Sequence, residues 1–113
     1  WVNSYIVFQH IPPARGMALL ERLLDRVEPN GFASLHLTIY RDGVVAKGGG
    51  WQQIRTMWGR MRAPKGSVLM YDYDLSQICR LFHARGMQRL SLVHTDHGGH
   101  HGVIVFARRA PAA

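Results

Sequence analysis

The sequence predicts an α/β (α+β) fold, a two-layer sandwich in which helices pack on a mixed sheet. Three observations support this prediction: short β-rich runs alternate with segments of helical periodicity, glycine and proline separate them, and the chain closes on a glycine-turned hairpin. We expect about five strands, two or three helices and a C-terminal β-hairpin, with the ferredoxin-like fold as the nearest simple architecture. The 113 residues suit a single domain at 1–109, with a disordered tail at 110–113.

The first half of the chain contains two predicted strands with a helix between them. Residues 4–11 (SYIVFQHI) form a β-rich run that stops at Pro12-Pro13, because proline cannot continue a strand or a helix there. Residues 14–27 repeat apolar side chains at three- and four-residue spacing, which predicts an amphipathic helix. Residues 33–40 (ASLHLTIY) alternate apolar and polar side chains, as a strand with one polar face does.

The second half continues the alternation of strands and helices. Residues 44–46 could form a short strand, and residues 51–61 carry a helical apolar stripe. Residues 67–73 (SVLMYDY) predict a further strand. Residues 75–87 predict a helix, with Asp74 or Ser76 as its N-cap.

The closing hairpin is predicted within residues 88–109, where two apolar runs flank Gly98-Gly99. A two-residue hairpin turn requires positive φ angles, which glycine adopts without strain. Four of the seven histidines lie at this bend. The pairs that this turn sets opposite each other are His97 with His100 and Asp96 with His101.

One face of the hairpin gathers potential metal ligands. Period-two alternation puts His94, Asp96 and His101 on the same face, and leaves His97 and His100 on the other. Two imidazoles and a carboxylate form a set that suits Zn, Mn or Fe. The predicted cofactor, if the hairpin binds one, is therefore a divalent metal at these three residues, and the alternative is that the histidines are only solvated.

The charge balance is strongly basic, with fourteen Lys and Arg against seven Asp and Glu. Such an excess favours polyanions as partners. The basic residues are concentrated in residues 41–65. Trp51 and Trp58 lie in the same segment, where their rings could stack on bases or could instead face the core. The predicted phosphate contacts are Arg41, Lys47, Arg55, Arg60, Arg62 and Lys65.

These observations support a small basic nucleic-acid-binding domain as the leading interpretation, with RNA preferred to DNA, alone or as a ribonucleoprotein subunit. The alternative is a structural or protein-interaction subunit without catalysis, whose partners are other protein subunits. Whether the protein is an enzyme is left open, with the balance against catalysis.

A second alternative is catalytic. His36 and Thr38 share one face of the predicted strand in LHLTIY, and this His-x-Thr pattern resembles the 2H phosphoesterases over the first part of the chain. That family carries two such strands, whose histidines act as general acid and base on RNA or cyclic phosphates. The second motif would be His101-Gly102-Val103, where valine stands in place of the family's hydroxyl. The resemblance implies a phosphodiesterase or nuclease with His36 and His101 in proton transfer and Thr38 on the phosphate.

Cysteine and apolar content bear on the compartment. Cys79 is the only cysteine, so the chain forms no internal disulfide and no cysteine-based zinc site. No run approaches the about 18 apolar residues of a membrane span, and no signal peptide is visible. We therefore expect a reducing intracellular compartment, either the cytoplasm or an organelle matrix, and no membrane partner.

Overall fold

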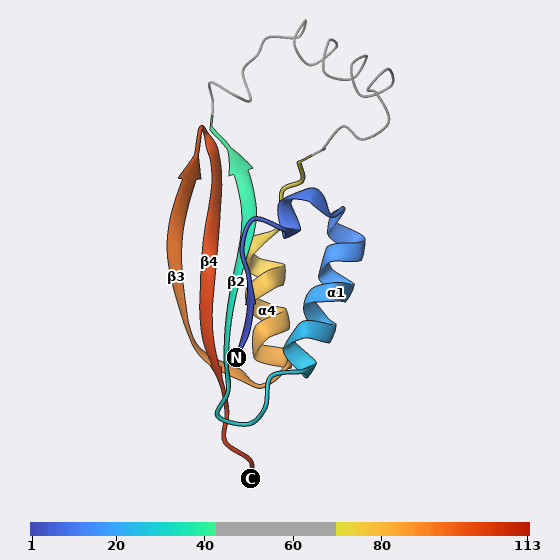
Figure 1. Ribbon diagram of the computed structural model, residues 1–113, viewed down its shortest axis with the longest axis vertical. Helices are drawn as coiled ribbons and strands as arrows, with labels where there is room; N and C mark the ends of the chain where they lie inside the picture. The colour runs from blue at the N-terminus through green and yellow to red at the C-terminus, as the bar shows by residue number, and fades with distance from the viewer. Residues whose placement is uncertain (43–69) are drawn as a thin grey trace, which may run out of the picture.

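The computed structural model describes residues 1–42 and 70–113. Figure 1 shows two layers, with both helices on one face of a sheet. The strand predicted at 44–46 and the helix predicted at 51–61 lie outside the described residues. Within the described ranges, no helix is long and apolar enough to cross a membrane. The elements in chain order are β1 (Val2–Ser4), the 3-10 turn η1 (Phe8–His10), α1 (Pro13–Asp25), β2 (Phe32–Arg41), α4 (Leu75–Ala84), β3 (Met87–His97) and β4 (His100–Arg109).

The sheet is mixed, with strand order β1-β2-β4-β3. β1 and β2 are parallel neighbours, while β4 runs antiparallel to both β2 and β3. As a result β1, β2 and β3 all point the same way, and their carboxyl ends lie toward one edge of the sheet, which we call the carboxyl edge. The prediction of a two-layer mixed fold is confirmed, but the described sheet has four strands and not five.

The ferredoxin-like expectation is wrong. In a split β-α-β unit another strand separates the two parallel strands, whereas here β1 and β2 are adjacent and joined through α1. Residues 70–73, predicted as the end of a strand, join no ladder. Instead the backbone N–H of Tyr71 donates to Gln9 O and that of Tyr73 donates to Thr38 O, both at 2.7 Å. Because these two bonds reach different segments, the chain here crosses between elements without extending the sheet.

The first strand was predicted at residues 4–11, but it lies earlier in the chain and shares only Ser4 with that range. β1 ends at Ser4, and Ile6 adopts a left-handed backbone with φ of 56° before the chain enters η1. Helix α1 then begins at Pro13, a position where the missing N–H of proline costs nothing. The proline pair therefore marks the start of a helix and not the end of a strand.

The hairpin prediction is confirmed in detail. Gly98 and Gly99 form the turn with φ of 64° and 90°, and the register pairs His97 with His100 and Asp96 with His101. Helix α4 begins where expected, because the side chain of Asp74 accepts a 2.9 Å hydrogen bond from the backbone N–H of Gln77.

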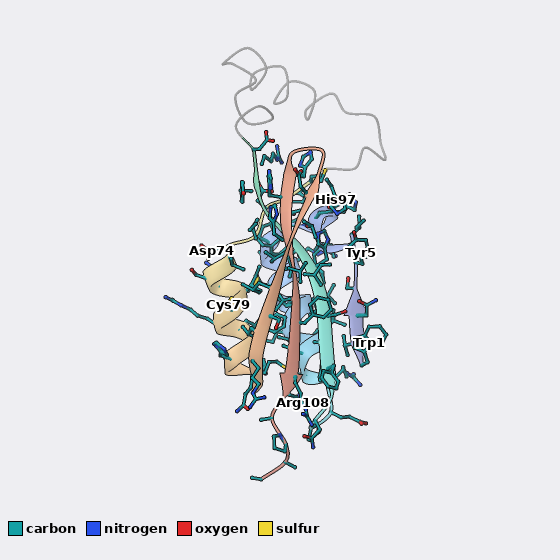
Figure 2. All side chains as sticks on the ribbon, turned by 90° about the vertical axis from the view of Figure 1, so that its left-hand side faces the viewer. Trp1, Tyr5, Asp74, Cys79, His97 and Arg108 are labelled. Atoms are coloured by element: carbon teal, nitrogen blue, oxygen red, sulfur yellow. The ribbon has the colours of Figure 1, made fainter. Side chains whose placement is uncertain are left out.

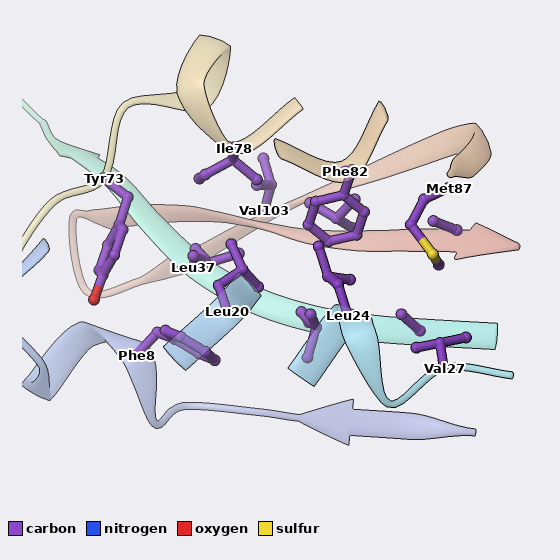
Figure 3. Close-up of a cluster of buried hydrophobic side chains, with 14 residues drawn as sticks. Phe8, Leu20, Leu24, Val27, Leu37, Tyr73, Ile78, Phe82, Met87 and Val103 are labelled. Carbon is purple, nitrogen blue, oxygen red and sulfur yellow. The ribbon is translucent and has the colours of Figure 1, made fainter. Parts of the chain in front are cut away.

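The core lies between the helices and the sheet (Figure 3). Alternate residues of β2 and β4 face it, as strand periodicity requires. Leu35 and Leu37 of β2 and Val103 and Val105 of β4 belong to one buried cluster with the apolar stripes of α1 and α4. The helix residues of this cluster are Leu20, Leu24, Ile78 and Phe82.

The other face of the sheet, which we call the open face, carries no helix among the described residues (Figures 1 and 2). Ser34 lies on this face and donates to Asn3 Oδ1 at 2.7 Å, which ties β2 to β1. Large apolar side chains are nevertheless exposed there. They are Trp1, Phe32, Val93 and Phe106.

Candidate active site

The predicted catalytic residues His36 and His101 lie on opposite faces of the sheet. A Cβ added to Gly102 would point at His36 Nε2 and Thr95 Oγ1, at 2.9 Å from each, so this position faces the open face. The neighbouring His101 must then point to the helix side. The predicted acid-base pair across one cleft is therefore wrong. Thr38 is buried and its hydroxyl donates to Tyr71 O, so it is not free to hold a phosphate.

Four side chains from three elements meet on the open face, and we call them the open-face cluster: Tyr5, His36, Thr95 and His97. The hydroxyl of Tyr5 lies 3.3 Å from His97 Nε2, and His36 Nε2 lies 2.9 Å from Thr95 Oγ1. The His36 ring centroid is 5.0 Å from that of Tyr5 and 5.6 Å from that of His97. Tyr5 follows β1, His36 lies within β2, and Thr95 and His97 belong to β3, so the cluster joins the three strands that share a direction.

The hydrogen bonds of His36 define its tautomer. The backbone N–H of Ile6 donates to His36 Nδ1 at 3.3 Å, so the ring proton of the neutral form resides on Nε2 and is donated to Thr95. Burial of the ring and the nearby His97 lower the pKa of His36 below its usual value. The side chain, which is 1% exposed, is therefore neutral at pH 7.

The turn at Ile6 is strained. A φ of 56° is rare for a β-branched residue, because Cβ crowds the carbonyl in the left-handed region. Such backbone strain persists only where surrounding contacts hold it, and it concentrates at functional sites. Here the hydrogen bond from Ile6 N–H to His36 is one of those contacts.

The second histidine cluster lies on the helix side of the hairpin and comprises Tyr40, Asp42, His94 and His101. His94 Nε2 and His101 Nδ1 are 2.7 Å apart, and the ring of Tyr40 stacks on His101 with a centroid distance of 4.6 Å. His101 Nε2 also lies 3.9 Å from Asp42 Oδ2. The prediction that His94 and His101 share a face is thus confirmed.

The predicted metal set is not assembled. The side chain of Asp96 accepts a 2.8 Å hydrogen bond from the backbone N–H of Gly99, which stabilises the hairpin turn. Residues 1–42 and 70–113 contain no group of three or more His, Cys, Asp or Glu side chains that could hold a metal ion.

The predicted phosphate contacts can be placed only in part. Arg41 turns toward its own chain: its guanidinium donates to Met70 O at 2.9 Å and lies 3.8 Å from the carboxylate of Asp72. The remaining five predicted contacts lie outside the described residues. They are Lys47, Arg55, Arg60, Arg62 and Lys65.

Comparison with known proteins shows the fold. No family model and no curated protein matches the sequence. Among solved structures, magnesium protoporphyrin IX methyltransferase from Synechocystis, with SAH bound, is 16% identical with a TM-score of 0.62, over 96% of this chain and 44% of that one. An O-methyltransferase family 2 protein from Planctomyces limnophilus, in complex with apigenin, is 9% identical with a TM-score of 0.56, over 96% and 30%. Human N-acetylserotonin methyltransferase, in complex with SAM, is 15% identical with a TM-score of 0.52, over 96% and 28%.

The fold is methyltransferase-like, and the chain spans less than half the length of each of these enzymes. This likeness overturns the leading interpretation of an RNA-binding domain or ribonucleoprotein subunit. The phosphodiesterase alternative required His36 and His101 to share one cleft, and it is wrong because these two side chains lie on opposite faces of the sheet.

Sequence reasoning missed Tyr5, Ile6, Thr95 and His97 as a cluster. Tyr5 was assigned to the interior of a strand, and His97 only to the face that it shares with His100. A usable signal was present, however, because a strand, a proline-started helix and a second strand form a parallel unit. Ligands of such units bind outside the carboxyl ends of the strands, which would have drawn attention to the residues after Ser4.

Proposed function

We propose that this chain is part of the catalytic domain of a SAM-dependent methyltransferase. One observation carries the proposal: 96% of the chain superposes on an enzyme whose structure contains SAH, with a TM-score of 0.62. Since the chain covers 44% of that enzyme, the methyl transfer itself belongs to the natural polypeptide that contains this chain.

The strand directions support this proposal. In open α/β sheets, ligands bind in the crevice outside the carboxyl ends of the parallel strands. Three of the four strands here end toward one edge, and the open-face cluster includes the residue that follows β1 and the last residue of β3. The open-face cluster, with its two histidines and one tyrosine, thus lies where this fold places its ligands.

The unpaired edge strand and the exposed open face of the sheet also support the proposal. β1 ends the sheet and has no outer partner in the described part of the chain, although it is a parallel strand. The open face also exposes the large apolar side chains of Trp1, Phe32 and Phe106, which a further layer of the domain would cover. The rest of a methyltransferase domain would continue the sheet beyond β1 and cover these side chains.

The methyl donor does not fit the described residues by themselves. The connection from β1 to α1, residues 5–12, contains no glycine and ends at Pro12, so it lacks the close backbone approach that nucleotide-binding turns use. The nucleoside would therefore bind mainly to the other part of the domain. This chain would supply the wall on the acceptor side, and we assign it no step in the transfer of the methyl group.

Isothermal titration calorimetry with S-adenosylhomocysteine tests the proposal on the natural polypeptide that contains the chain. We expect saturable one-to-one binding that S-adenosylmethionine competes away and that NAD does not. Absence of binding at about 1 mM ligand, which corresponds to about 4 kcal/mol of affinity, would reject the proposal.

A further inference from the structure

We propose that Tyr5 and His97 form a proton relay that accepts the proton of a weakly acidic acceptor hydroxyl, and that His36 is the positioning residue of this pair. The inference rests on the proposed function, because the hydroxyl is that of the methyl acceptor. Beyond the proposed function, the relay specifies the chemical class of the methyl acceptor and the side chains that take its proton.

The geometry places a reachable hydroxyl against an imidazole. Tyr5 is 48% exposed, and its hydroxyl lies 3.3 Å from His97 Nε2. The two residues are 92 positions apart in the chain, and only the parallel arrangement of β1 and β3 brings their strand ends to the same side. Figure 2 shows both side chains on the open face, near the carboxyl edge.

The proton transfer balances without any further reactant. The relay requires that in the resting pair the hydroxyl of Tyr5 donates to His97 Nε2 and that the ring proton of His97 is on Nδ1. When an acceptor hydroxyl donates to the Tyr5 oxygen, its O–H bond breaks and its proton passes to that oxygen. The original proton of Tyr5 moves to His97 Nε2, which becomes part of an imidazolium, and the electron pair stays on the acceptor oxygen.

The chemistry of the relay groups identifies the acceptor class. The phenol hydroxyl of Tyr5 exchanges a proton most readily with a hydroxyl of similar chemistry, which is that of a phenol or an enol. An aliphatic alcohol is far less acidic, and a thiol or a neutral amine needs no such relay. The flanking rings of Tyr5 and His36 also suit a planar acceptor.

His36 holds the relay in place and does not compete for the proton. Its Nδ1 accepts from the strained Ile6 amide, next to Tyr5, and its ring packs against both relay partners. Because burial keeps His36 neutral, it adds no fixed positive charge beside His97. The other titratable group opposite His97 is His100, its partner across the turn.

The chain offers a matched control for the relay. Tyr40 is 49% exposed, almost as much as Tyr5, and likewise contacts a histidine, but it lies over His101 in the other cluster. Tyr5→Phe and Tyr40→Phe therefore remove the same hydroxyl from surfaces of equal exposure. The first should affect the relay, and the second should not.

Nitrogen-15 NMR of the histidine rings, on the natural polypeptide that contains the chain, tests the pairing. In Tyr5→Phe we expect the preference of His97 for the Nδ1–H tautomer to disappear, because Nε2 loses its hydrogen-bond donor. Tyr40→Phe should leave His97 unchanged. An identical His97 tautomer ratio in wild type and Tyr5→Phe would overturn the relay.

A coloured phenol tests proton acceptance without any methyl donor. Added 4-nitrophenol should show increased phenolate absorbance in the presence of wild type and of Tyr40→Phe, and little increase with Tyr5→Phe or His97→Gln. An increase that is equal in all four proteins, or absent in all of them, would overturn the relay. Failure of S-adenosylhomocysteine to bind would instead reject the proposed function, so the two ideas fail separately.

A comparison of two His36 variants shows whether His36 positions the relay or only stabilises the fold. His36→Ala should abolish the phenolate response and the His97 tautomer preference, whereas His36→Asn keeps an oxygen that can accept from Ile6 and should restore part of both. If His36→Asn matches wild type in stability but His36→Ala retains the full response, the positioning role is wrong.

Discussion

Replacement of Gly16 by alanine should destabilise the protein, although alanine is the better helix former. Gly16 is buried in α1 against the side chain of Tyr73, and an added Cβ would lie 1.7 Å from the Tyr73 hydroxyl oxygen. The phenol cannot swing away easily, because Tyr73 is buried in the core and its hydroxyl donates to Ile11 O at 2.6 Å. This hydroxyl also carries a pKa raised to about 12 by burial, so it stays protonated and remains a donor.

The size of the effect follows from three contributions. Alanine in place of glycine inside a helix stabilises by about 1 kcal/mol. Overpacking a buried site costs about 1–3 kcal/mol, and loss of the hydrogen bond from Tyr73 costs about a further 1 kcal/mol. We therefore expect Gly16→Ala to lower the free energy of unfolding by about 2 kcal/mol.

Urea denaturation measures this change, with Ala18→Gly as the control. Ala18 is exposed on the same helix, so the reverse exchange there should cost only the helix propensity, about 1 kcal/mol. In a Tyr73→Phe background Gly16→Ala should cost at least about 1 kcal/mol less than in wild type, because the contacting oxygen is gone. A Gly16→Ala protein as stable as wild type would refute the reasoning.

Three further predictions concern the sheet, α4 and pH. Gly102→Ala would put a Cβ 2.7 Å from Leu37 O and 2.9 Å from His36 Nε2. We therefore expect urea denaturation to show a free energy of unfolding lower by about 1–3 kcal/mol, and NMR to show displaced His36 ring resonances. Unchanged resonances would argue against the contact. Asp74→Ala should lower the free energy of unfolding by about 1 kcal/mol, because helix α4 loses its N-cap. Asp74→Asn can still accept the hydrogen bond from Gln77, so its stability in thermal denaturation should stay close to that of wild type. Because the folded pKa of His36 is lowered, the unfolded chain binds more protons just below its ordinary value of 6.5. Stability should therefore fall as the pH drops through 6.5 toward the folded pKa and then level off, and His36→Gln should flatten this slope; an equal slope in both proteins would contradict the pKa assignment.

Local signals explain the elements that sequence reasoning predicted well. The turn at Gly98-Gly99 and the alternation on both sides of it are contained within the hairpin, so its register followed directly. The same holds for α4, where Asp74 and the apolar stripe lie within a few residues of each other.

The elements that were predicted wrongly depend on distant contacts. The first strand ends early because Ile6 takes a left-handed conformation that is tied to His36, thirty positions away. The order of the sheet depends on which strands pair after folding, and periodicity carries no information on that choice. Alternation along residues 33–40 identified His36 as a polar position in a strand, but it could not show that Tyr5 and His97 would cover it.

The central claim is that this chain forms part of a methyltransferase domain that binds its ligands at the carboxyl edge. Amide chemical-shift mapping with S-adenosylhomocysteine, on the natural polypeptide that contains the chain, tests it most directly. Because the nucleoside binds mainly to the other part of the domain, we predict few shifts within these 113 residues, and we expect them around Tyr5–Val7 and the end of β3 at His97, where the carboxyl edge borders the ligand. Shifts confined to the opposite end of the sheet, around Asn30 and Arg108, or no shifts at all, would contradict the account.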